Sequence, residues 1–326
     1  MNSRLFLACV SAMLYTSSGA FDLQAHRGGR GLAPENTRAA FEQALAIGVT
    51  TLEADLAMTR DGVLVLSHDP RLNPALTRGA DGRWLDDTGP AIFSLTRSEL
   101  AQFDVGRLNP ESQYSRQWLA QRPVDGSRIP TLAELFALAA GSAVRFNIET
   151  KITPEVTRDG VGDTPNAERF ARAVVDEIRR AGLERRVTVQ SFDWRTLVAV
   201  RQLAPEIVTA CLTIQTANND TVRPEADGVS SWHAGLRLAD HGDSVPRLVK
   251  AAGCAIWSPF WRNLSPGLVQ EAHALGLGVL PWTVNEPADM ARLVEWRVDG
   301  IITDYPDRLR KVMAAKGMPL PPGEGE

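Results

Sequence analysis

The sequence is poor in cysteine, has no strong excess of charge and contains no apolar run long enough to span a membrane. It has 3 cysteines in 326 residues, and the spacing of Cys211 and Cys254 fits no zinc-binding motif. The net charge is −4 and no basic cluster stands out, which argues against nucleic acid as a partner. Hydrophobic residues make up 44% of the chain, which is enough for a full globular core.

Residues 1–20 have the pattern of a secretory signal peptide. Arg4 is followed by an apolar run of ten residues and then by small residues before a cleavage site after Ala20. The run is too short for a transmembrane helix, so we expect no stable membrane insertion and a periplasmic or secreted mature protein. A poorly ordered apolar tail is the alternative. In an exported protein Cys211 and Cys254 could be joined, although two unpaired buried cysteines are equally compatible with the sequence.

The stretch at 24–69 carries the first chemical signal. In the apolar run TTLEADLAM, Glu53 and Asp55 are two residues apart, so a strand turns both carboxylates to the same face. Burying two like charges together is costly, which predicts a cation between them, and a divalent ion with oxygen ligands fits best. An edge strand with a solvated acidic face is the alternative. His26 and His68 stand near the two ends of the stretch, each after an apolar run that is typical of a strand.

A second pair lies in RFNIETK at 145–151, where Glu149 and Lys151 share a strand face. Glu149 could supply a third carboxylate to the metal, and Lys151 a positive charge for an anion. A plain salt bridge between the two is the alternative. With Arg27 and the two histidines, the set suits a metal-assisted attack on a phosphate ester. In such a reaction the metal and the cations neutralise phosphate charge, and the histidines move protons near neutral pH.

Apolar periodicity predicts one large α/β domain over 21–316. Eight strands alternate with helices, which is the pattern of a (β/α)8 TIM barrel, and an antiparallel hairpin arm turns at Asp61-Gly62 and returns His68 towards the carboxylates. Residues 70–128 are rich in turn residues and are interpreted as an insertion after strand 2 that covers the barrel mouth. The proline- and glycine-rich tail at 317–326 is predicted to be disordered.

The same residues identify a family by resemblance. AHRG, APENT, LEADL, TRDG and SHD occur in this order within 24–69, followed by IETK at 148–151, QSF at 190–192, PWTVN at 281–285 and GIITDYP at 300–306. This ordered series closely resembles the glycerophosphodiester phosphodiesterase family, in its secreted or periplasmic bacterial form. The resemblance implies metal ligands at Glu53, Asp55 and Glu149, an acid and a base at His26 and His68, phosphate contacts from Arg27 and Lys151, and a substrate-pocket position for Trp282.

The function implied is hydrolysis of glycerophosphodiesters, a class of small molecules, to glycerol 3-phosphate and an alcohol with the help of Ca²⁺ or Mg²⁺. One alternative is a phospholipase D-like enzyme of the same fold that acts on lysophospholipids or sphingolipids. Its mark would be an exposed apolar rim at the barrel mouth, which Trp232, Trp257, Phe260 and Trp261 could form, although these residues could equally be core. Another is a non-catalytic phosphodiester-binding protein, which should lack at least one acid, base or ligand. The two histidines, the three metal ligands and the two phosphate contacts are all present. The sequence leaves open the head group, the oligomeric state, which histidine is the acid, and whether water or a glycerol hydroxyl attacks.

Overall fold

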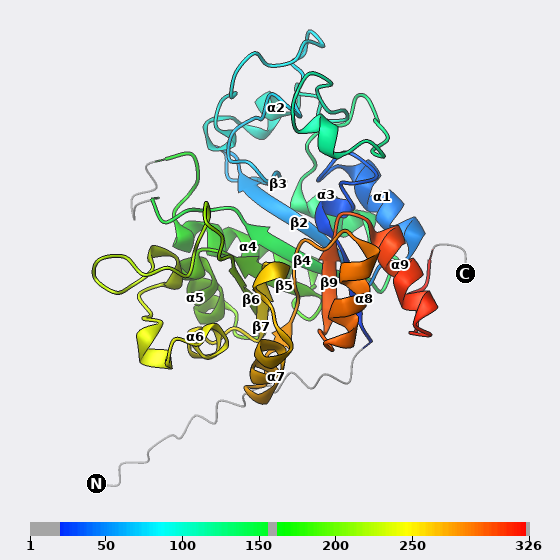
Figure 1. The fold of residues 1–326 in the computed structure, drawn as a ribbon. Helices are drawn as coiled ribbons and strands as arrows, with labels where there is room; N and C mark the ends of the chain where they lie inside the picture. The colour runs from blue at the N-terminus through cyan, green and yellow to red at the C-terminus, as the bar shows by residue number, and fades with distance from the viewer. Residues whose placement is uncertain (1–19, 156–161, 324–326) are drawn as a thin grey trace, which may run out of the picture.

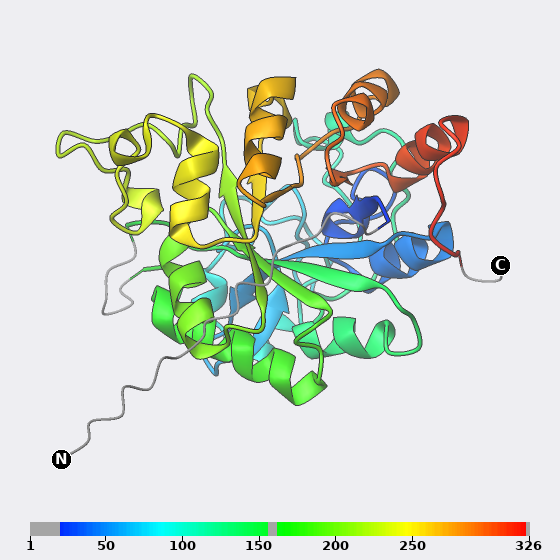
Figure 2. The same ribbon diagram turned by 90° about the horizontal axis from the view of Figure 1, so that it is seen from below.

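A computed structural model describes residues 20–155 and 162–323, so the predicted signal peptide lies outside the described residues except for Ala20. Eight parallel strands form one sheet in the order β8-β7-β6-β5-β4-β2-β1-β9, with β3 antiparallel to β2 (Figures 1 and 2). The strands are β1 Asp22–Ala25, β2 Thr51–Met58, β3 Leu64–Leu66, β4 Arg145–Thr150, β5 Val187–Ser191, β6 Val208–Thr213, β7 Ile256–Pro259, β8 Gly278–Val279 and β9 Gly300–Thr303.

The sheet curls into a nearly closed barrel whose two ends, β8 and β9, meet at a seam. Backbone hydrogen bonds cross this seam from Asp299 N to Val279 O at 3.0 Å, from Ile302 N to Pro281 O at 3.0 Å and from Val284 N to Ile302 O at 3.1 Å. The predicted (β/α)8 barrel is therefore confirmed. At the seam, β8 is regular strand over only two residues, Gly278–Val279. Pro281 has no backbone N–H, which removes one donor from the pairing pattern beyond β8.

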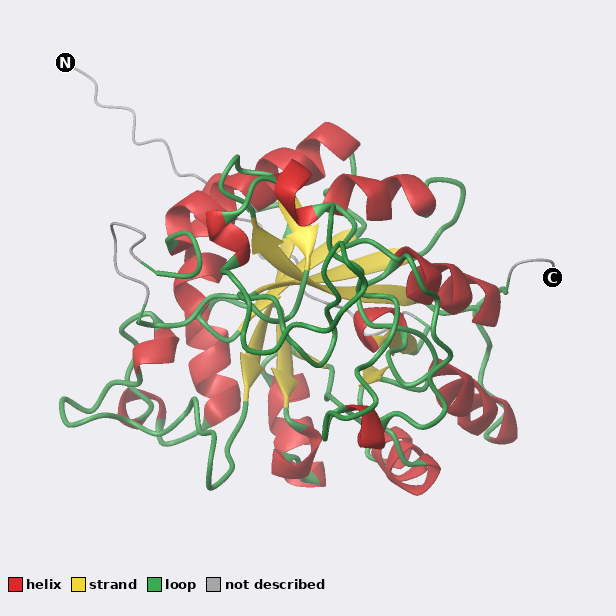
Figure 3. Ribbon diagram, turned by 90° about the horizontal axis from the view of Figure 1, so that it is seen from above, coloured by secondary structure: helices red, strands yellow, loops and turns green. Residues whose placement is uncertain are grey.

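Helices surround the barrel, as the view from above shows (Figure 3). They are α1 Arg38–Ile47, α3 Leu132–Leu138, α4 Ala167–Ala181, α5 Trp194–Leu203, α6 Val245–Ala252, α7 Pro266–Ala274, α8 Pro287–Glu295 and α9 Pro306–Ala315. Local sequence explains several of their ends. Thr37 caps α1 by accepting from Ala40 N, and Thr131 and Glu134 form a capping box at α3. No helix in the described ranges is long and apolar enough to cross a membrane.

The hairpin and the insertion stand above the barrel in Figure 1. Strand β3 pairs with the end of β2, with Leu66 opposite Leu56, and the chain turns between them at Asp61 and Gly62. The insertion at 70–128 contains the short helix α2 Arg97–Leu100. A small apolar cluster fixes it to the hairpin and consists of Ala57, Val65, Leu72, Ile92, Leu100 and Ile129. The insertion therefore packs on the barrel through the hairpin.

Two features differ from the sequence-based expectations. Trp257 is only 2% exposed and packs in the core, so it forms no part of an apolar rim at the mouth. The tail, predicted to be disordered from residue 317, is contacted at Pro321. Arg310 Nη1 donates to the carbonyls of Pro321, at 2.5 Å, and of Gly48, at 3.1 Å. One tail carbonyl is thus held beside Gly48 at the end of α1, a contact that composition alone does not reveal.

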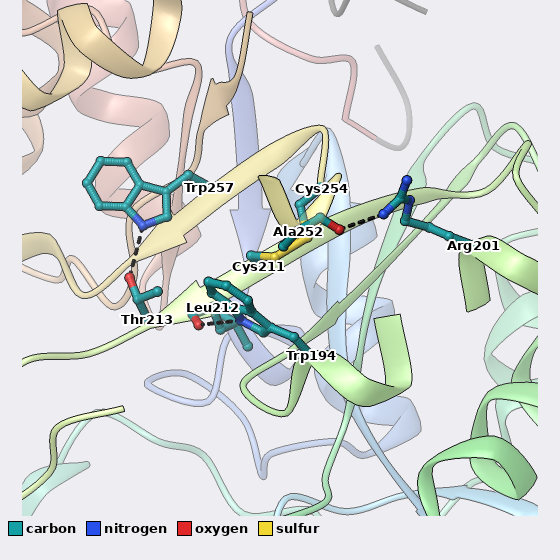
Figure 4. The surroundings of a disulfide bond; sticks show 8 residues. All are labelled: Trp194, Arg201, Cys211, Leu212, Thr213, Ala252, Cys254 and Trp257. Carbon is teal, nitrogen blue, oxygen red and sulfur yellow. Dashed lines mark hydrogen bonds between the residues drawn. A yellow bond between two sulfur atoms is a disulfide. The ribbon is translucent and has the colours of Figure 1, made fainter. Parts of the chain in front are cut away.

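Cys211 of β6 and Cys254, just before β7, form a disulfide with a Cα–Cα distance of 5.9 Å (Figure 4). Both cysteines are buried, and Arg201 of the neighbouring helix α5 donates to the carbonyl of Ala252 close by, at 2.5 Å. Strands β6 and β7 are hydrogen-bonded neighbours, which brings the two cysteines together despite their separation of 43 residues. Of the two alternatives that the sequence left open, the structure contains the bonded one.

Removing this disulfide is expected to destabilise the fold. The disulfide joins cysteines 43 residues apart and so restricts the unfolded chain. The chain-entropy account gives about 4 kcal/mol of stabilisation for a loop of this length. The double variant Cys211→Ala/Cys254→Ala should therefore lose about that much free energy of unfolding in a urea titration. Thiol titration of the denatured but unreduced mature chain is the control. It should find no free thiol, and detection of two would contradict the prediction.

Candidate active site

The predicted site residues meet at the ends of β1, β2 and β4. His26 and Arg27 directly follow β1, Glu53 and Asp55 lie in β2, and Glu149 lies in β4 directly opposite Asp55. Parallel neighbouring strands end at the same edge of a barrel, which explains why residues far apart in the sequence converge there. The hairpin returns His68 to the same edge, because Ser67 N donates to the carbonyl of Asp55 at 3.0 Å.

Three carboxylates form a cluster at this edge. One oxygen each of Glu53, Asp55 and Glu149 lies within 4.8 Å of the other two. Glu53 and Asp55 are 0% exposed, and β2 lies between β1 and β4, so the alternative of a solvated acidic edge strand is wrong. Asp55 Oδ1 is buried and has no hydrogen-bond partner among the described residues. A buried carboxylate oxygen without a donor is costly unless a cation is near it.

Neighbouring side chains hold the carboxylates in place. Glu53 accepts from the Gln190 side-chain amide at 2.9 Å and from the Arg27 backbone N–H at 2.7 Å. Asp55 Oδ2 accepts from Asn36 Nδ2 at 3.0 Å, and Asn36 Oδ1 accepts from the Asp55 backbone N–H at 3.2 Å. Asn36 and Gln190 were missed as site residues. Asn36 stands in APENT, directly before Thr37, the residue that caps α1.

These oxygens fit a hard divalent cation such as Ca²⁺ or Mg²⁺. Burial, and then the charges of Asp55 and Glu149, raise the pKa of Glu53 well above its ordinary value. Burial, with a further contribution from Asp55, raises the pKa of Glu149 to about 7, although Lys151 opposes this. Burial alone would raise the pKa of Asp55, but Arg27, His68 and Lys151 lower it below its usual range. Glu53 and Glu149 are thus harder to ionise than free carboxyls, and a bound cation would favour their charged forms.

Metal binding is expected to strengthen as the pH rises towards 7. Because the pKa of Glu149 is raised to about 7, this carboxyl is protonated in more acidic solution, and a metal must displace its proton. Each displaced proton weakens the apparent affinity by up to about tenfold per pH unit. Calorimetric titration with Mg²⁺ or Ca²⁺ is carried out at pH 5.5, 6.5 and 8. Binding should be tighter at pH 6.5 than at pH 5.5, and the further gain at pH 8 should be smaller per pH unit. Equal affinity at all three would contradict the prediction.

Arg27 and Lys151, the predicted phosphate contacts, flank the carboxylates. Arg27 Nη1 lies 2.7 Å from Glu35 Oε1, and its Nε lies 3.1 Å from Asp55 Oδ2. Lys151 Nζ lies 2.6 Å from Glu149 Oε1, so the salt bridge considered as an alternative is present. The backbone of Arg27 has a φ of 53°, which a non-glycine residue keeps only where its surroundings hold it. Such outliers gather at functional sites, and Arg27 is one of them.

His26 is held by the carboxylate of Asp304, which directly follows β9. Its Nδ1 lies 2.6 Å from Asp304 Oδ1, and Arg30 Nε donates to the same oxygen at 2.7 Å. Asn285 Nδ2 donates to the other oxygen of Asp304 at 2.6 Å. When the Nδ1–H of His26 donates to the Asp304 carboxylate, the free Nε2 of the ring can exchange a proton with a ligand. Burial lowers the pKa of His26 although Asp304 opposes this, so the ring is neutral at pH 7.

His68 also has a carboxylate partner. Its Nδ1 lies 2.8 Å from Asp69 Oδ1, and the side chain is 33% exposed. Burial, and then the charges of Arg27 and Lys151, lower the pKa of His68 to about 4. Both predicted acid–base histidines are thus neutral in the absence of a ligand. Each is oriented through Nδ1 by a carboxylate, which leaves Nε2 for proton transfer.

A pocket of about 400 Å³ opens beside His68, Glu149 and Lys151. Aromatic side chains of Phe192 and Trp232 form part of its wall. Trp282 lies next to Phe192, with ring centroids 5.4 Å apart, and its indole N–H donates to the carbonyl of Ser258 at 2.9 Å. The assignment of Trp282 to the substrate pocket stays a prediction.

His233 and His241, both in the loop at 215–245, are not among the residues of this site. His233 is buried and stacks on Trp194 with centroids 4.4 Å apart, as a packing histidine does. His241 lies at the end of a short 3-10 turn, Ala239–His241.

Comparison with known proteins identifies the family. A family model described as the glycerophosphoryl diester phosphodiesterase family matches residues 26–308. A glycerophosphodiester phosphodiesterase of Bacillus subtilis is 30% identical over 288 residues, which are 88% of this chain and 85% of that protein. A Silicibacter pomeroyi structure, provisionally assigned as a glycerophosphoryl diester phosphodiesterase, is 35% identical with a TM-score of 0.82 and covers 94% of this chain and 97% of its own.

A more distant structure shares the fold. This Oleispira antarctica phosphodiesterase, solved with the product sn-glycerol-3-phosphate, is 23% identical with a TM-score of 0.64 and covers 89% of this chain and 96% of its own. The family model spans most of the chain and includes every predicted acid–base, metal-binding and phosphate-binding residue. The chain therefore belongs to the glycerophosphoryl diester phosphodiesterase family.

Proposed function

We propose that this enzyme hydrolyses glycerophosphodiesters to glycerol 3-phosphate and an alcohol with one divalent metal ion, Ca²⁺ or Mg²⁺. The observation that carries the proposal is the buried cluster of Glu53, Asp55 and Glu149, with its oxygens within 4.8 Å of one another and a cation on either side. Such a site combines metal ligands with positive charge for a phosphate. The names of the relatives and the family membership support the same substrate class.

Arg27 and Lys151 would bind the non-bridging oxygens of the phosphate. Both cations already lie beside the metal-binding carboxylates, at 3.1 Å from Asp55 and 2.6 Å from Glu149. A phosphate placed there would meet positive charge from two directions, which restricts its orientation. When bound at the three carboxylates, the metal would neutralise phosphate charge and polarise the phosphorus centre.

His26 and His68 would move the protons. One ring takes a proton from the attacking hydroxyl or water, and the other gives a proton to the oxygen that leaves. Asp304 and Asp69 fix the ring orientations through Nδ1, at 2.6 Å and 2.8 Å. A negatively charged phosphate beside each ring favours the protonated form, which raises the pKa of the ring that serves as the acid.

We also propose that the protein is exported and matures by cleavage after Ala20. The pattern of residues 1–20 supports this, and so does the buried disulfide, because disulfides persist mainly in oxidising compartments. Amino-terminal sequencing of the protein recovered from the periplasm or medium of its host should begin near Phe21. A cytoplasmic protein that keeps Met1 would contradict the proposal.

The function is tested with the purified mature chain, residues 21–326. It is incubated with glycerophosphocholine, glycerophosphoethanolamine and glycerophosphoglycerol, and released glycerol 3-phosphate is measured. EDTA should abolish the activity, and Ca²⁺ or Mg²⁺ should restore it, with the more effective ion identifying the metal. No activity on any head group with either ion would reject the proposal. Higher, detergent-dependent activity on a lysophospholipid would favour the phospholipase D-like alternative.

A further inference from the structure

One segment of the insertion lies directly on the loop that follows β1. Gln121 Nε2 donates to the carbonyl of Arg30 at 2.8 Å, and the Arg122 backbone N–H donates to the carbonyl of Leu32 at 2.9 Å. Trp118 covers the guanidinium of Arg30, whose carbon lies 4.5 Å from the ring centroid. These contacts hold the insertion against the loop that contains His26 and Arg27. They add to the attachment of the insertion to the hairpin.

Tyr114, in the same segment, reaches the buried partner of Arg27. Its hydroxyl donates a short hydrogen bond to Glu35 Oε2, and the other oxygen of Glu35 accepts from Arg27 Nη1 at 2.7 Å. The side chains of Glu35 and Arg27 are only 6% and 8% exposed. In the part of the chain that the structure describes, Tyr114 is the only hydrogen-bond donor to Glu35 Oε2. Glu35 is thus held between the insertion and the guanidinium of Arg27.

The same hydroxyl also contacts the group beside His26. Arg30 Nη1 donates to Tyr114 Oη at 3.1 Å, and Arg30 Nε donates to Asp304 Oδ1 at 2.7 Å. That oxygen is the one that lies 2.6 Å from His26 Nδ1. One phenol therefore stands at the junction of two chains of contacts, one ending at Arg27 and the other at His26.

We propose that Tyr114 is a positioning residue that makes the insertion part of the phosphate site, by fixing Glu35 and through it Arg27. The proposal rests on the proposed function in taking Arg27 as a phosphate contact. A buried carboxylate that loses its only donor on one oxygen must turn or recruit another donor. Either change moves Glu35 Oε1, which accepts from Arg27 Nη1 at 2.7 Å, and the buried guanidinium of Arg27 then loses its fixed position.

Tyr114→Phe tests the proposal, and Tyr305→Phe is its matched control. Both tyrosine rings contact Trp118, at centroid distances of 5.9 Å and 6.3 Å, so each change removes a hydroxyl beside the same indole. Within the described ranges the Tyr305 hydroxyl makes no hydrogen bond, whereas that of Tyr114 makes two. Loss of a hydrogen bond to charged groups typically corresponds to about 10- to 100-fold in binding.

The readout is calorimetric binding of inorganic phosphate to the metal-loaded chain, together with kcat and KM for a glycerophosphodiester. Tyr114→Phe should weaken phosphate binding about 10- to 100-fold and raise KM more than it lowers kcat, because Arg27 already contacts the ground-state phosphate. Tyr305→Phe should match the wild type. Thermal unfolding of both variants is measured alongside, so that a change in phosphate affinity is separated from a general loss of fold.

A double-variant cycle with Glu35→Gln identifies the route. If Tyr114 acts through Glu35, adding Tyr114→Phe to Glu35→Gln should weaken phosphate binding no further. Equal losses in both backgrounds, or a Tyr114→Phe variant that matches Tyr305→Phe, would overturn the proposal. Failure of the wild type to bind phosphate would overturn it too. If the wild type binds phosphate but cleaves no glycerophosphodiester, and Tyr114→Phe still weakens binding, the positioning role stands while the proposed function falls.

Discussion

Replacement of His26 by alanine is expected to lower kcat for glycerophosphodiester cleavage by about 10²–10⁴-fold, the usual contribution of a positioned acid or base. The ring is oriented by Asp304 at 2.6 Å and is buried beside the carboxylate site, so no water or neighbouring side chain can substitute for it at the same geometry. Released glycerol 3-phosphate is measured at saturating metal and substrate, so that the change is in kcat.

His241→Ala is the control for this experiment, because His241 ends the short turn Ala239–His241 in the loop at 215–245, away from the strand ends that carry the site. It should retain wild-type activity. If the His26→Ala variant keeps the wild-type kcat, His26 takes no part in the mechanism. The experiment also separates an enzyme from a binding protein of the same fold. A binding protein has no turnover to lose, whereas a catalyst should keep its affinity for phosphate while its rate falls.

Asp55→Asn is expected to lower activity by a comparably large factor, because it weakens metal binding. Asp55 is 0% exposed, its Oδ1 has no hydrogen-bond partner in the described ranges, and its Oδ2 is held by Asn36. The amide keeps the shape of the side chain but removes one of the three negative charges that a divalent ion requires. Metal-ion stabilisation of a transition state is worth several kcal/mol, so activity at a fixed low metal concentration should fall about a thousandfold or more.

The measurement is metal affinity by calorimetry, followed by activity over a rising metal concentration. Partial recovery at high metal is expected, since Glu53 and Glu149 remain. Asp22→Asn is the control, because Asp22 is also a buried carboxylate but lies at the start of β1 and pairs with Arg145 at 3.1 Å. It should leave metal affinity unchanged. Wild-type metal affinity in Asp55→Asn would place the ion elsewhere.

Much of the site could be predicted because its signals are local. Glu53 and Asp55 are two residues apart in one strand, and Glu149 and Lys151 repeat that spacing in the next strand of the sheet. Alternation in a strand fixes which side chains share a face, and barrel geometry brings strand ends together. The hairpin at Asp61-Gly62 likewise determines that His68 returns to the site.

The residues that support this site could not be predicted from spacing. Tyr114 reaches Glu35 across 79 residues, from an insertion whose sequence has no clear periodicity. Asp304 contacts both Arg30 and His26, and its contact with His26 spans 278 residues. Such contacts depend on which loops meet above the barrel, and no short sequence pattern encodes that meeting. The disulfide was undecided for the same reason.

The seam between β8 and β9 couples the integrity of the barrel to its chemistry. Asn285 follows the segment that crosses this seam, and it both accepts from the Asp304 backbone N–H and donates to the carboxylate that orients His26. A local opening of the seam would release Asp304 while the other strands stayed paired. If this seam opens locally before the rest of the barrel unfolds, enzymatic activity should fall at a lower temperature or denaturant concentration than total secondary structure does.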